Sequence, residues 1–127
     1  MKIRWTKNSV RFRITPADLE SLQNHQPITE EIAFGNGYWE ASIGVAAATH
    51  LWFEKMILQI QISPADLAQL AAPEHEGVYF STDSEPSIRY IIEKDFPCAH
   101  PRAAEALEPK TETFAAPPDF ERRKQQN

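Results

Sequence analysis

Two aspartates, Asp18 and Asp66, stand at matching positions in the stretches ITPADL and ISPADL. A pair of carboxylates can perform acid–base chemistry when the fold brings them together. Each aspartate also lies three residues after a threonine or serine and two after a proline, which is the pattern of a helix start. A carboxylate in the first helical turn bonds free backbone N–H groups and interacts favourably with the helix dipole. We therefore predict that both aspartates cap helices.

The histidines and the single cysteine are the residues best suited to metal binding or nucleophilic chemistry. The histidines stand at positions 25, 50, 75 and 100, whereas metal ligands typically recur at short spacings on one face of an element. Cys98 and His100 are the only close pair of soft ligands, and the sequence offers no obvious third. We therefore expect no metal ion and no cofactor, and we interpret Cys98 as a buried structural thiol at the end of the last strand.

The N-terminal region is unusually basic, because five of the thirteen lysines and arginines lie between Lys2 and Arg13. If residues 2–5 pair with residues 10–14 in a hairpin, Lys2 and Arg4 share a face with Arg11 and Arg13. Like charges opposite each other destabilise a sheet unless something neutralises them. The favoured interpretation is a charge ladder with glutamates of neighbouring strands, for which the candidates are Glu30, Glu31, Glu40 and Glu93. The alternative is an anion site formed by Arg4, Arg11 and Arg13.

Nucleic acid is disfavoured as the anion. Trp5 and Phe12 occupy positions whose parity predicts an inward orientation, so they do not supply the exposed aromatic rings expected for base stacking. The net charge of −5 also argues against a nucleic-acid binder, which usually carries a basic surplus.

A repeat defines the elements that must position these residues. The stretch VRFRITPADLESL, residues 10–22, returns as LQIQISPADLAQL, residues 58–70, without a gap. In each copy, apolar residues at every second position predict a strand with one buried face, and the following Pro begins a short helix. Upstream, the parity of the apolar positions switches. This switch predicts a turn or bulge in the first copy, where Lys7–Ser9 has suitable turn residues. In the second copy Glu54–Lys55 could form a turn, although Met56–Ile57 favours a continued strand with a bulge.

The repeat predicts an α+β fold made of two β–α–β–β units. Further strands are predicted at 31–34, 38–45, 78–81 and 88–93. Since one unit cannot close its own core, we expect the two to pack about a pseudo-twofold axis into one mostly antiparallel sheet or partial barrel with two short helices.

The expected domain organisation follows from this repeat. We expect a single globular domain over residues 1–98, with repeats at about 1–47 and 49–96. The Pro/Ala-rich residues 99–127 are expected to form a largely extended or disordered tail.

Composition narrows the class of protein. At 127 residues, with 42% hydrophobic and 24% charged residues, the chain is typical of a soluble globular domain. No apolar run is long enough for a signal peptide or a membrane span, and a single cysteine precludes an internal disulfide. We therefore expect a cytoplasmic protein. Motifs for nucleotide binding or zinc hydrolysis are absent from the sequence.

Two segments, MKIRWTKNSVRFRIT and IRYIIEKDFPC, resemble a family of small uncharacterised bacterial proteins, a domain of unknown function. The shared positions are Asn8, Ser9, Arg11, Arg13, Glu93, Lys94, Asp95, Phe96 and Cys98. The resemblance implies a bacterial, cytosolic, single-domain protein and attaches no activity to it.

Our leading functional hypothesis is a non-enzymatic interaction or binding module, with a protein partner or an anionic ligand at the basic N-terminal residues. The alternative is a small enzyme that uses Asp95, Cys98 and His100 in a cleft between the repeats. A homodimer that pairs exposed strand edges is a third hypothesis, since an open sheet leaves edges to protect.

Overall fold

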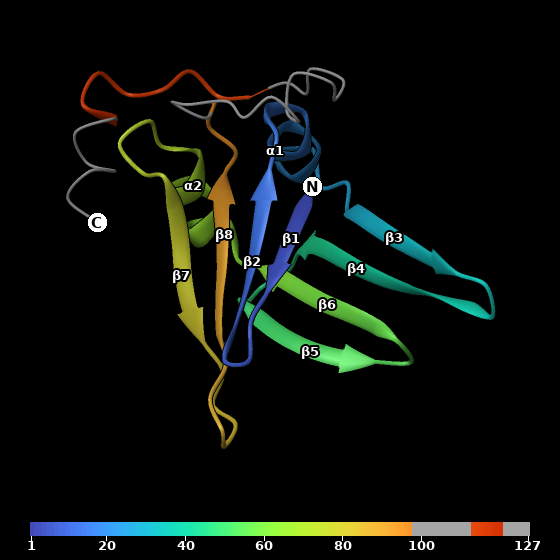
Figure 1. Cartoon of the computed structure of the whole chain (residues 1–127). Helices are drawn as coiled ribbons and strands as arrows, with labels where there is room; N and C mark the ends of the chain where they lie inside the picture. Colours follow the sequence, from blue (N-terminus) through green and yellow to red (C-terminus); the bar gives the residue numbers. More distant parts are fainter. Residues whose placement is uncertain (98–112, 121–127) are drawn as a thin grey trace.

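The computed structural model of the protein describes residues 1–97 and 113–120. In these ranges the chain forms two short helices and eight strands (Figure 1). The order is β1 (Lys2–Trp5), β2 (Ser9–Ile14), α1 (Pro16–Gln23), β3 (Ile28–Phe34), β4 (Gly37–Val45), β5 (His50–Glu54), β6 (Ile57–Ile62), α2 (Pro64–Ala71), β7 (Gly77–Ser81) and β8 (Arg89–Lys94). The predicted α+β class and mostly antiparallel pairing are confirmed.

The described strands form two sheets rather than one, and these sheets do not close into a barrel. Sheet A has the order β1-β2-β8-β7, and sheet B has the order β3-β4-β6-β5. Each sheet therefore combines one hairpin from each repeat. Figure 1 shows the hairpins β3–β4 and β5–β6 extending together, away from sheet A. The sequence pattern predicted that each strand has one buried face. It did not show what covers that face, because a second sheet can cover it as well as a helix can.

Parallel pairs join the two repeats at the centre of each sheet. Strand β2 pairs in parallel with β8, and β4 pairs in parallel with β6. The two sheets are related by the repeat, because Ser9 pairs with Arg89 in sheet A just as Ile57 pairs with Glu40 in sheet B. Each repeat has one more strand than the predicted β–α–β–β unit. These additional strands, β1 and β5, come first in their repeats and lie at the edges of their sheets.

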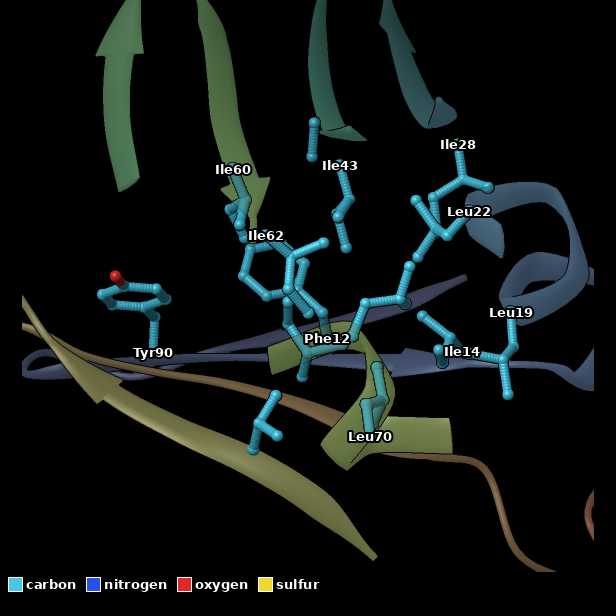
Figure 2. Packing of buried hydrophobic residues seen from close by; sticks show 14 of the residues in the cluster. Phe12, Ile14, Leu19, Leu22, Ile28, Ile43, Ile60, Ile62, Leu70 and Tyr90 are labelled. Atoms are coloured by element: carbon cyan, nitrogen blue, oxygen red, sulfur yellow. The ribbon is translucent and has the colours of Figure 1, made fainter. Parts of the chain in front are cut away.

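The hydrophobic core lies between the two sheets. Figure 2 shows Phe12 and Ile14 of sheet A converging with Ile43 and Ile60 of sheet B, and all four side chains are fully buried. Alternate residues of β2 and β6 are buried along the whole strand, as the period of two predicted. Helix α1 contacts strands of both sheets and also contacts α2, so the two helices close one end of the core. Apolar burial of this kind is the main stabilising term for such short helices.

Both helices begin with the predicted capping arrangement. The Thr15 hydroxyl accepts a hydrogen bond from the Asp18 N–H at 3.1 Å, and the Asp18 carboxylate accepts one from the Thr15 N–H at 3.0 Å. In the second repeat the Ser63 hydroxyl accepts from the Asp66 N–H at 3.1 Å. There the Thr49 hydroxyl accepts from the Ser63 N–H and donates to the Asp66 carboxylate. Each aspartate is thus engaged at the start of its own helix.

The connection between β5 and β6 is a tight turn, one residue beyond the Glu54–Lys55 turn that the sequence allowed, and not the bulge that Met56–Ile57 favoured. Lys55 and Met56 form a two-residue turn in which both residues have positive φ, 49° and 67°. This left-handed pair is typical of hairpin turns whose twist matches that of antiparallel strands. Met56 resembles a strand residue in sequence, but its side chain is exposed because it lies at the tip of the hairpin.

Part of the expected tail packs against sheet A. In the C-terminal segment (residues 113–120), the Phe114 N–H donates to the Asp95 carbonyl at 3.0 Å, and Phe120 is buried. Phe96 packs against both rings, with centroid distances of 6.1 Å and 5.0 Å. Figure 1 shows this segment in red, beyond the end of β8. The rest of the expected tail lies outside the described residues.

The interleaved topology predicts that neither repeat folds as a monomer when it is expressed alone. Residues 1–47 and 48–127 each lack the partner strands of both of their hairpins, so each should show no cooperative unfolding as a monomer. An equimolar mixture should form a 1:1 complex with the helix and strand content of the intact chain. Circular dichroism and size-exclusion chromatography measure both properties. A monomeric half that unfolds cooperatively would contradict the topology.

Candidate functional site

The outer face of sheet A carries the basic residues of the N-terminal hairpin. Since Phe12 points into the core, its neighbours Arg11 and Arg13 point outward. The hairpin register places Arg4 opposite Arg11 and Lys2 opposite Arg13, so these four cations share one face, as predicted. The register between β2 and β8 adds a fifth cation to this surface. We call Lys2, Arg4, Arg11, Arg13 and Arg89 the basic face.

Glu93 partly neutralises the basic face. Its carboxylate accepts a hydrogen bond from Arg13 Nε at 2.7 Å, and Arg11 Nε lies 3.6 Å from the same oxygen. One carboxylate therefore serves two guanidinium groups, which is the charge ladder that the sequence analysis favoured. Lys2 Nζ lies 3.2 Å from a carboxylate oxygen of Asp95.

Two cations of the basic face have no ion pair among the described residues. Arg4 and Arg89 are both exposed, and the carboxylates of the face engage their neighbours instead. Arg4 also stands directly opposite Arg11, and of these two like charges only Arg11 has an anionic partner among the described residues. An anion that reached Arg4 would relieve the remaining repulsion.

An apolar centre lies between the cations on the same face. Tyr79 pairs with Ile91, which in turn pairs with Arg11, so all three side chains point outward from neighbouring strands. The Tyr79 side chain is 60% exposed, whereas Ile91 is only 5% exposed. The surface thus offers a phenol ring and several guanidinium groups to a partner.

The outer face of sheet B has the opposite charge. Glu31 and Glu40 stand opposite each other, and Glu54 lies on the far edge strand at the same level. We call these three residues the acidic face. The four strands of sheet B contain no lysine or arginine. His50 and Trp52 stack on this side with their ring centroids 5.0 Å apart.

The residues of the enzymatic hypothesis are placed only in part. Asp95 is buried, and one of its carboxylate oxygens has no hydrogen-bond partner in the described ranges. Lys2 reaches that oxygen at ion-pair distance but without hydrogen-bond geometry. Cys98 and His100 lie outside the described residues. Within residues 1–97 and 113–120, no three His, Cys, Asp or Glu side chains are grouped to hold a metal ion.

The sequence profile of a family of unknown function, DUF7009, matches residues 1–117. The chain belongs to this family. The resemblance to an uncharacterised family is thereby confirmed. The matched residues include both sheets and most of the C-terminal segment. No curated protein and no solved structure matches the chain. Neither described helix is long and apolar enough to cross a membrane.

A buried lysine anchors the C-terminal segment in this family member. Lys94 is 7% exposed, and its Nζ donates a 2.8 Å hydrogen bond to the carbonyl of Ala72 at the end of α2. The same nitrogen lies 5.7 Å from the centroid of the Phe114 ring. Burial lowers the pKa of Lys94, and the nearby Glu74 opposes this effect. A pocket of about 440 Å³ lies beside this contact.

An apolar groove lies at the end of the core opposite the helices. The helices follow the final residues of β2 and β6. The groove lies at the other end of these strands, where Val10 and Leu58 line it together with Trp5 and Phe53. Its volume is about 380 Å³. Trp5 has the predicted inward parity, but it is 52% exposed because this end of the core is left uncovered. Its ring lies 5.9 Å from that of Trp39.

Sequence reasoning missed three residues of these surfaces. Alternation along β8 places Arg89 on the same face as Glu93, and alternation along β7 turns Tyr79 outward between two inward neighbours. Both alternations were present in the sequence, but only the pairing of β8 with β2 brings Arg89 to the basic face. The burial of Lys94 had no such signal, because lysine is rarely buried and its partner carbonyl belongs to another element.

Stability should depend on pH through Lys94. The unfolded chain keeps this proton up to the ordinary pKa of 10.5, whereas the folded protein releases it at lower pH. Stability therefore rises with pH in this interval, by up to about 1.4 kcal/mol per pH unit. The free energy of unfolding of wild type should rise relative to that of Lys94→Met as pH increases toward 10.5. Denaturant titrations measure this difference, with exposed Lys7→Met as control. Parallel pH curves for wild type and Lys94→Met would contradict the burial.

Proposed function

We propose that this protein is a non-enzymatic binding module that recognises an anionic partner through the basic face. The observation that carries the proposal is the pair Arg4 and Arg89, exposed cations without an anionic partner among the described residues, on a face where five cations meet two carboxylates. Guanidinium groups bind carboxylates and phosphates through charge-assisted, often bidentate hydrogen bonds.

The chemistry of the face favours an acidic protein partner. Tyr79 supplies an exposed aromatic contact of the kind enriched at protein interfaces. The net charge of −5 repels a long polyanion at a distance, so the attraction acts over the basic face and not over the whole molecule. The enzymatic alternative has no comparable support, since Asp95 is buried beside Lys2.

We also propose that the protein is bacterial and cytoplasmic. The resemblance of its two motifs to small bacterial proteins supports the first, and a single cysteine fits the reducing compartment of the second.

Heparin chromatography tests the basic face with a generic polyanion. Wild type should be retained at low salt, and Arg4→Gln/Arg89→Gln should elute at lower salt because it removes the two unpaired guanidinium groups. The control Lys7→Gln/Lys55→Gln removes the same charge from two hairpin turns and should elute with wild type. All three proteins should agree in stability within about 0.5 kcal/mol, as for typical surface substitutions. Equal loss of retention in both variants would show only a net-charge effect and reject the proposal.

Glu93→Gln should strengthen anion binding while it weakens the fold. The change removes the carboxylate shared by Arg11 and Arg13, so heparin elution should shift to higher salt. Loss of this half-exposed ion pair should cost about 1 kcal/mol of stability, measured by chemical denaturation. Glu31→Gln, which removes the same charge from sheet B, is the matched control. An equal shift in elution for both variants would contradict a localised site.

A further inference from the structure

We propose that the basic face binds the acidic face of a second copy of this chain, so that copies associate with sheet A of one against sheet B of the next. The inference rests on the proposed function and names its partner. The two faces have the same strand order and the same arrangement of parallel and antiparallel pairs. They therefore match in layout, although β3 and β4 are longer than the equivalent strands β7 and β8.

The two faces carry opposite charge, and at one pair of equivalent positions the sign is reversed directly. Arg89 and Glu40 are equivalent residues of the repeat, because each pairs with the first residue of the central strand, Ser9 or Ile57. Sheet B contributes glutamates and no lysine or arginine in its strands, whereas the basic face has a surplus of cations. Complementary fields of this kind steer association and select the partner.

Each face also contains an unfavourable pair that the other face would relieve. Arg4 stands directly opposite Arg11 in sheet A, and Glu31 stands directly opposite Glu40 in sheet B. Like charges at such positions destabilise a sheet. When the two faces meet, each pair gains counter-ions from the other, and this gain is absent in the isolated molecule.

Aromatic side chains add apolar contact area on both sides. Tyr79 on the basic face is 60% exposed, and Tyr38 on the side of Glu40 is 55% exposed. Trp52, stacked on His50, lies on the same side of sheet B but is half-buried. Exposed tyrosine is enriched in protein interfaces, where it buries a large area at low entropic cost.

The geometry of this contact is heterologous, since the two partners contribute different surfaces. Each copy retains one free basic face and one free acidic face after it binds a neighbour, so association continues until it closes into a ring or remains an open chain. Contact between two basic faces is disfavoured by their like charge. The expected behaviour is therefore association that grows with protein concentration and falls with salt.

Head-to-tail complementation tests this contact. The basic-face variant is Arg4→Gln/Arg89→Gln, and the acidic-face variant is Glu31→Gln/Glu40→Gln, because neutral substitutions remove each face without creating a complement to the other. In sedimentation velocity at low salt, wild type should form species larger than a dimer. Each variant alone should lose them and remain monomeric. Their mixture keeps one intact basic face and one intact acidic face on different chains, so it should give a 1:1 heterodimer and nothing larger. In about 1 M salt, where the Debye length is about 3 Å, wild type should become monomeric.

The controls separate this inference from the proposed function. Lys7→Gln/Lys55→Gln makes the same change in net charge as the basic-face variant but lies in two turns, and it should associate like wild type. Thermal melts establish that each variant is folded, and a single substitution from the same face, Arg4→Gln or Glu40→Gln, replaces a variant that is not. Monomeric wild type that still binds heparin overturns the inference and leaves the proposed function standing. Association that survives both variants, as strand-edge pairing would, also overturns it. Wild type that neither binds heparin nor associates overturns both.

Discussion

The parallel pairing of β2 with β8 and of β4 with β6 is the constraint on which the rest of the structure depends. These pairs place a strand of one repeat beside a strand of the other at the centre of each sheet. The apolar sides of both sheets then face each other, with Phe12 and Ile60 buried between them. The helices must lie at one end of this core because each follows the final residue of a central strand. Without the cross-repeat pairs, both hairpins of each repeat would leave their apolar faces in water.

The same arrangement leaves the two outer faces uncovered by any described element. A mostly antiparallel sheet can leave one face in water, so the outer positions of these sheets carry charge without disturbing the core. The charge of the basic face is compensated only in part, since the Glu93 carboxylate pairs with Arg11 and Arg13 but not with Arg4. Uncompensated charge of opposite sign therefore gathers on opposite sheets. The proposed binding role rests on this separation, because the charges lie on open surfaces.

Local features of the fold were predictable from the sequence, whereas long-range features were not. Alternation from Val10 to Ile14 and the Thr15–Pro16 start fixed a strand, its buried face and a capped helix. Alternation cannot say which strand pairs with which, so the exchange of hairpins between the repeats was missed. The basic hairpin was predicted, but Arg89 was left out because its strand joins the face only through that exchange. Lys94 was beyond prediction, since its burial depends on a carbonyl of α2 and a ring of the C-terminal segment.

The exchange of hairpins also bears on the origin of the chain. A protein with a single repeat could complete both sheets only by pairing with an identical copy, which would form a dimer with a true twofold axis. Both outer faces of such a dimer would carry the same residues and the same sign of charge. Two repeats in one chain are free of this restriction, and the equivalent residues Arg89 and Glu40 differ in charge. A single chain with two repeats can therefore be a polar molecule, which a symmetric dimer of one repeat cannot be.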